Sequence, residues 1–99
     1  MSDMPHYIAL IHKDVESGYG ISFPDLPGVV TASDTLDGAI AEAAEALSFA
    51  AEDWRHLTGH AFPEPRSLDV LRGDQNFISD SRDAVVAAIP FSKGVSRAA

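Results

Sequence analysis

Carboxylates are the most chemically capable side chains in this sequence, but their spacing does not assemble a catalytic cluster. A two-metal nuclease site needs several carboxylates that converge on one point. Asp25 lies where the strand-like run of GISFPDLPG ends, and Asp34 follows the next strand-like run, so these two carboxylates could approach each other. A second inward-facing carboxylate on a predicted strand is missing. Metal-dependent nuclease chemistry therefore stays open only as an alternative.

Histidine and serine residues give equally little support for catalysis. His56 and His60 have the i,i+4 spacing with which two imidazoles can share a metal ion, but Gly59 lies between them and no third ligand is apparent. His12 falls on an apolar strand face, where backbone groups usually satisfy the ring. No serine lies in a G-x-S-x-G elbow, and no glycine-rich phosphate-binding motif occurs. We therefore expect neither enzymatic activity nor a cofactor.

Length and composition predict a single cytoplasmic domain. The chain has 99 residues and no cysteine, which rules out a disulfide scaffold, a thiolate nucleophile and a cysteine-rich zinc site. Its apolar runs are far shorter than the roughly 20 residues that cross a bilayer. The first residues, MSDMPH, lack the basic start and apolar stretch of a secretion signal.

Negative charge is concentrated in one half of the chain. The net charge is −8, and nine acidic residues lie from Asp14 to Asp53, a segment without Lys or Arg. Such a segment repels a phosphate backbone, so we do not expect it to bind nucleic acid directly. It would speed and orient the capture of a basic partner, although acidity also serves solubility alone.

Alternating apolar patterns predict four strands. Residues 7–13 are apolar on both alternating faces, as in an inner strand. Residues 19–23 follow a polar turn and should pair with the first strand as a hairpin, and residues 29–32 form a short third strand. Residues 84–91, AVVAAIPF, predict a buried last strand that returns beside the first.

The PDLPG segment between the second and third strands predicts a bend. Pro24 and Pro27 cannot donate ladder hydrogen bonds, and Gly28 accepts backbone angles that other residues resist. Asp25 lies inside this bend without a catalytic partner nearby in sequence. We therefore expect the segment to serve shape first.

The segment from Asp34 to about Arg55 is the clearest helix, with Asp34 as the expected N-cap. Phe49 lies outside the apolar side of this helix. We therefore expect Phe49 either to contact another subunit or partner, or to be buried at the flank of the helix. A single short helix is expected in SLDVLRGD, residues 67–74, with Ser67 as its cap. The apolar stripe of the long helix consists of Leu36, Ile40, Ala43, Ala44, Leu47, Ala51 and Trp54.

The order of these elements predicts an α+β fold with a three-stranded antiparallel meander and one main helix packed on the sheet. Residues 19–54, YGISFPDLPGVVTASDTLDGAIAEAAEALSFAAEDW, moreover resemble the HicB family of antitoxins. The matching features are G-x-x-F-P-D-L-P-G, the helix start D-T-L-x-x-A-I, the run E-A-L and the later P-x-P-x-S-L-D. The resemblance implies a truncated RNase H-like βββαβ domain over residues 6–91, followed by a flexible tail at 92–99.

The resemblance also implies a protein partner. Members of the family bind and occlude HicA, a small basic RNA-cleaving toxin, and short members often form homodimers or homotetramers. Full-length relatives carry a C-terminal DNA-binding module, for which SKGVSRAA is too short, so DNA binding is not expected unless the chain is a fragment. Two alternatives stay open: a metal-dependent RNase H-like nuclease, and a stand-alone oligomeric module without a toxin. The residues expected to contact the toxin are Asp25, Asp34, Glu42 and Glu45, and those expected to hold the bend are Pro24, Pro27 and Gly28.

Overall fold

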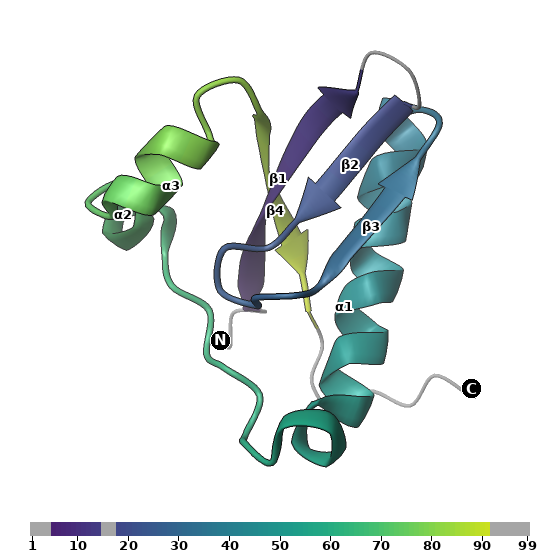
Figure 1. The fold of residues 1–99 in the computed structure, drawn as a ribbon, viewed down its shortest axis with the longest axis vertical. Coiled ribbons are helices and arrows are strands. Elements are labelled where there is room, and N and C mark those ends of the chain that lie inside the picture. The colour runs from purple at the N-terminus through teal and green to yellow at the C-terminus, as the bar shows by residue number, and fades with distance from the viewer. Residues whose placement is uncertain (1–4, 15–17, 92–99) are drawn as a thin grey trace.

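A computed structural model describes residues 5–14 and 18–91, which form one antiparallel four-stranded sheet with helices on both faces (Figure 1). The strand order is β3-β2-β1-β4, so the last strand returns beside the first, as predicted. The tail expected at 92–99 lies outside the described residues. The elements are β1 (His6–Asp14), β2 (Gly18–Ser22), β3 (Val30–Ser33), α1 (Leu36–Thr58), α2 (Leu68–Leu71), α3 (Gln75–Asp80) and β4 (Val85–Pro90).

Strand β1 is the inner strand that its apolar pattern predicts. It pairs with β2 through Ile11 opposite Ile21, and with β4 through Tyr7 opposite Ile89. Residues 7–11 are all buried, because one face of β1 packs under α1 and the other under the two short helices. Both neighbours run antiparallel to β1, which confirms the predicted hairpin and the position of the last strand. The prediction that the last strand is buried was wrong, since β4 lies at the edge of the sheet and only Ile89 in it is buried.

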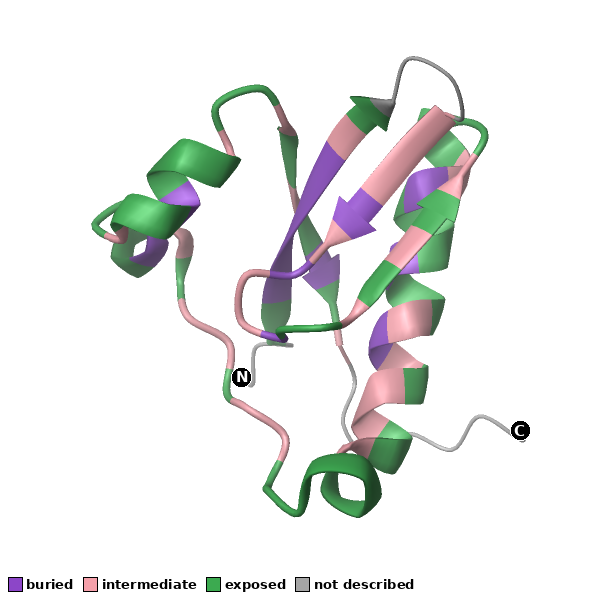
Figure 2. Ribbon diagram, in the orientation of Figure 1, coloured by how far each residue is buried: buried purple, intermediate pink, exposed green. Residues whose placement is uncertain are grey.

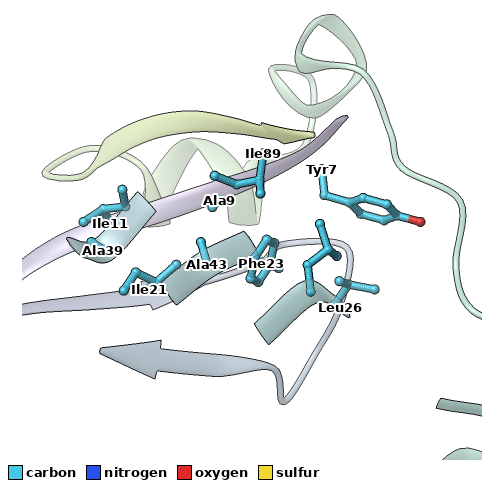
Figure 3. Close-up of a cluster of buried hydrophobic side chains, with 10 residues drawn as sticks. Tyr7, Ala9, Ile11, Ile21, Phe23, Leu26, Ala39, Ala43 and Ile89 are labelled. Atoms are coloured by element: carbon cyan, nitrogen blue, oxygen red, sulfur yellow. The ribbon is translucent and has the colours of Figure 1, made fainter. Parts of the chain in front are cut away.

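Helix α1 covers one face of the sheet by presenting small residues to it. Ala39 and Ala43 are completely buried and, with Leu47, pack against side chains of β1, β2 and β4 (Figure 3). The predicted stripe was wrong at Leu36, Ile40 and Ala44, since Leu36 and Ile40 are each 40% exposed and Ala44 is exposed as well. Alanines let the helix backbone lie close to the sheet, and the larger side chains are displaced to the flanks. The core of this face comprises Tyr7, Ala9, Ile11, Ile21, Phe23, Leu26, Ala39, Ala43, Leu47 and Ile89.

The ends of α1 carry regular caps. Thr35, rather than the predicted Asp34, is the N-cap: its Oγ1 accepts a hydrogen bond of 2.9 Å from the backbone N–H of Gly38. The helix begins at Leu36, so Asp34 is one residue too early for its carboxylate to reach that N–H group. Gly59 ends the helix with φ of 79°, and its N–H group donates to the carbonyl of Arg55. The helix therefore runs three residues past the predicted end at Arg55.

The opposite face of the sheet is covered by α2 and α3. Leu71 and Phe77 pack there against Ile8 and Leu10 of β1. Ser67 caps α2, as predicted, but the prediction of a single short helix was wrong, since α3 follows as a second one. The ring Nε2 of His12 lies 2.9 Å from the carbonyl oxygen of Asp80, at the end of α3. This contact agrees with the prediction that the backbone satisfies His12.

Candidate functional site

The bend between β2 and β3 consists of two consecutive tight turns. The N–H group of Leu26 donates to the carbonyl of Phe23 at 3.0 Å, and that of Val29 donates to the carbonyl of Leu26 at 3.1 Å. Pro24 and Pro27 occupy the second position of each turn, where proline fixes the required φ. Gly28 has φ of 90° in the second turn, a left-handed angle that favours glycine. The three residues predicted to hold the bend thus occupy its stereochemically demanding positions.

Asp25 points back into the protein and pairs with Arg66. Its side chain is only 5% exposed, and its two carboxylate oxygens accept hydrogen bonds from the backbone N–H of Arg66 at 2.7 Å and from Nε at 2.5 Å. The same guanidinium reaches Asp74, the N-cap of α3, at 3.0 Å. These bonds raise the pKa of Arg66, and Arg66 together with backbone N–H groups lowers the pKa of Asp74. Asp25 therefore joins the bend to the segment that leads into α2.

Arg66 is the functional-site residue that sequence reasoning missed. Asp25 and Arg66 are separated by 41 positions, so no local pattern links them. A carboxylate needs a cation only where the fold buries it, and the local sequence does not show that Asp25 is buried. Six cations lie from Arg55 onward, and nothing in their spacing singles out Arg66.

The other acids predicted to contact a partner lie on the surface, but not all together. Glu42 and Glu45 are exposed on α1, and Asp34 is exposed just before this helix begins. Glu52 and Asp53 follow Glu45 by seven and eight residues, about two helical turns, and so lie on the same side of α1. The acidic side of the helix is composed of Glu42, Glu45, Glu52 and Asp53. Figure 2 shows the predominantly exposed outer surface of α1. Within residues 5–14 and 18–91, no group of three or more His, Asp or Glu side chains is placed to hold a metal ion.

An apolar groove of about 370 Å³ separates the second half of α1 from the bend. Phe49 on its helix side is 58% exposed, and Leu57 near the end of α1 is 74% exposed. Trp54 is partly buried and packs against the sheet core beneath. The lining residues are Pro27, Gly28, Val29, Phe49, Ala50, Asp53, Trp54, Leu57 and Thr58.

Aromatic contacts hold in place Trp54, which lines this groove, and the segment that follows α1. Trp54 meets Phe62 edge-on at a centroid distance of 5.5 Å, and Phe62 also packs against Tyr7 and Phe91. The Tyr7 hydroxyl donates a hydrogen bond to the carbonyl of Pro63 at 2.5 Å. Burial raises the pKa of Tyr7 to about 12, and the charges of Glu64 and Asp25 add to this effect. The segment before α2 is therefore held against the core.

The family of the chain follows from comparison with known proteins. A family model described as the HicB-like antitoxin of bacterial toxin-antitoxin systems matches residues 7–95. The chain belongs to this family of antitoxins. No curated protein sequence matches it significantly. Within the described residues, no helix combines the length and apolar character needed to cross a membrane.

Solved structures with the same fold include HicB antitoxins. The N-terminal domain of Burkholderia pseudomallei HicB has a TM-score of 0.66 and 24% identity, over 88% of this chain and 98% of that one. A longer structure of the Burkholderia pseudomallei antitoxin has a TM-score of 0.73 and 27% identity, over 91% of this chain and 65% of that one. This chain thus spans about two thirds of that longer antitoxin. A chain of the HicA3 and HicB3 toxin-antitoxin complex has a TM-score of 0.66 and 23% identity, over 88% and 98% of the two chains.

Proposed function

We propose that this antitoxin binds a small basic toxin of the HicA type and covers the surface with which the toxin cleaves RNA. The acidic side of α1 is the observation that carries the proposal. A toxin that binds RNA presents cationic groups to phosphates, and an antitoxin that competes for those groups must offer negative charge in their place. Glu42, Glu45, Glu52 and Asp53 provide this charge along one side of a rigid helix.

The predicted partner-binding residues take different roles in this proposal. Glu42 and Glu45 contact the toxin directly, because both are exposed and lie one helical turn apart. Asp34 lies before the first turn of α1 and adds to the negative field there. Asp25 acts indirectly: its carboxylate is engaged by Arg66, so it holds the bend instead of reaching a partner. The same pairing supports a non-catalytic role for this chain.

Assembly is the second part of the proposal. Solved relatives include a toxin-antitoxin complex, and the short form of the family is expected to associate as a homodimer or homotetramer. An oligomer would place more than one acidic helix side in a single particle. Each protomer would then bind its own toxin molecule, because the groups named above all belong to one chain.

A binding experiment with matched charge variants tests the electrostatic basis of this proposal. The probe is a purified small basic toxin of the HicA type, titrated calorimetrically at several salt concentrations. We expect Glu42→Gln/Glu45→Gln to weaken binding at least tenfold at low salt, and to reduce the salt dependence. The control, Asp69→Asn/Asp83→Asn, removes the same charge from exposed positions outside α1 and should bind like the wild type. Equal weakening by both pairs would contradict a role for this helix side.

A further inference from the structure

We propose that the groove between α1 and the bend receives an apolar side chain of the toxin, presented between Lys or Arg residues. This inference rests on the proposed function and specifies how the toxin is recognised. The volume of about 370 Å³ falls within the roughly 300–1,000 Å³ typical of ligand pockets, so it can accept a large side chain. Most of the lining is apolar, and Asp53 is the one charged residue among the lining residues.

The surroundings of the groove indicate what kind of partner fits it. Phe49 lies four residues after Glu45 and four before Asp53, so its ring stands between acidic groups on the same side of the helix. Glu42 and Glu52 add negative charge on the same side of α1. An exposed aromatic residue flanked by acids along the helix complements an apolar side chain flanked by cations, and aromatic anchors of this kind dominate many interfaces.

A second copy of this chain fits the same surface poorly. In a two-fold contact through the groove, the acidic side of each α1 would face its own counterpart. Each chain carries a net charge of −8, and the segment that forms this side contains no Lys or Arg from Asp14 to Asp53. Like charges brought together at an interface oppose association. Charge complementarity therefore favours a basic protein over a second copy.

The groove is formed in advance of binding. Its helix wall is anchored by Ala43 and Leu47 in the core, and Trp54 is held against Phe62. The facing wall, Pro27 to Val29, is fixed by the two tight turns and by the bond from Arg66 to Asp25. A preorganised groove loses little conformational entropy when an apolar side chain enters it.

Trp54 provides a direct optical test, because it is the only tryptophan in the chain and lines the groove. The probe is again the small basic toxin of the HicA type, with its own tryptophans replaced by phenylalanine if it has any. We expect its addition to change the Trp54 emission of this chain. We also expect Phe49→Ala to weaken binding at least tenfold, mainly through faster dissociation, at low and high salt alike. The control is Val70→Ala on α2, since Val70 is also 58% exposed.

The outcomes separate this inference from the function on which it rests. If the wild type binds but Phe49→Ala and Val70→Ala bind equally well and Trp54 emission is unchanged, the groove proposal fails and the antitoxin proposal stands. If the wild type does not bind, both fail. An emission change that follows the concentration of this chain alone would assign the groove to a second copy and overturn the inference. Circular dichroism of Phe49→Ala verifies that the variant is folded.

Discussion

Replacing Asp25 by alanine removes the acceptor of two hydrogen bonds that join the bend to the segment before α2. One comes from the backbone N–H of Arg66 and the other from its Nε, and both end on a carboxylate whose side chain is 5% exposed. The Arg66 side chain is 40% exposed and keeps its contact with Asp74. The loss of each bond therefore lowers the free energy of unfolding by a different amount.

The expected loss of stability follows from this difference. A hydrogen bond to a charged group contributes about 1.5–3 kcal/mol, and the backbone N–H group loses such a bond in the variant. The exposed guanidinium can exchange its partner for water, so its bond adds less than about 1 kcal/mol. Asp25→Ala should thus lower the free energy of unfolding by about 1.5–4 kcal/mol. For a domain of this size, that corresponds to a fall in Tm of roughly 6–30 °C.

Thermal and urea unfolding followed by circular dichroism measure this loss. Asp34→Ala is the matched control: it removes an exposed aspartate and should change stability by less than about 0.5 kcal/mol. Arg66→Ala keeps the backbone N–H bond and opens Asp25 to water, so we expect a smaller loss than for Asp25→Ala. If Asp25→Ala unfolds like the wild type, the carboxylate does not hold the bend, and its role in fixing the groove is refuted.

Three further predictions concern the bend and the effect of pH. Gly28→Ala should cost about 1–2 kcal/mol, because an L residue resists the φ of 90° although its Cβ would meet no atom within 4 Å; urea unfolding measures this loss. The neutral hydroxyl of Tyr7 contributes stability that is fully present below its ordinary pKa of about 10 and is lost as pH rises through the folded value of about 12. Tyr7→Phe should therefore show a flatter dependence of unfolding free energy on pH across this window. The lowered pKa of Asp74 contributes stability that is present above the ordinary aspartate pKa of about 3.9 and is lost as pH falls through the pKa of the folded state. The unfolding free energy of Asp74→Asn should therefore change less on acidification, as urea unfolding at several pH values would measure.

The strands and the main helix could be predicted because each depends on a local repeat. The continuous apolar run in residues 7–13 and the period of two in residues 19–23 identify strands, and a long segment with apolar residues three and four positions apart identifies a helix. The bend was also predictable, since proline and glycine restrict or extend the backbone by their own chemistry. These are properties of short segments and do not require knowledge of the tertiary contacts.

Features that depend on distant contacts were not predictable. The rotation of α1 that buries Ala39 and leaves Ile40 exposed is set by how closely the helix approaches the sheet. Helix α3 has six residues and is stabilised by Phe77 packing on β1, which its own sequence does not reveal. The pairing of Asp25 with Arg66 and the groove each combine segments that are far apart in the chain. Partner contacts at Asp34, Glu42 and Glu45 stay a prediction.

Inhibition of RNA cleavage shows whether this chain neutralises a toxin. A purified small basic toxin of the HicA type is assayed on a labelled RNA while the antitoxin is titrated in. We predict that cleavage falls to background near one antitoxin chain per toxin, and that Glu42→Gln/Glu45→Gln shifts this titration to higher concentration. Undiminished cleavage in a saturating excess of the folded wild-type chain would refute the antitoxin function.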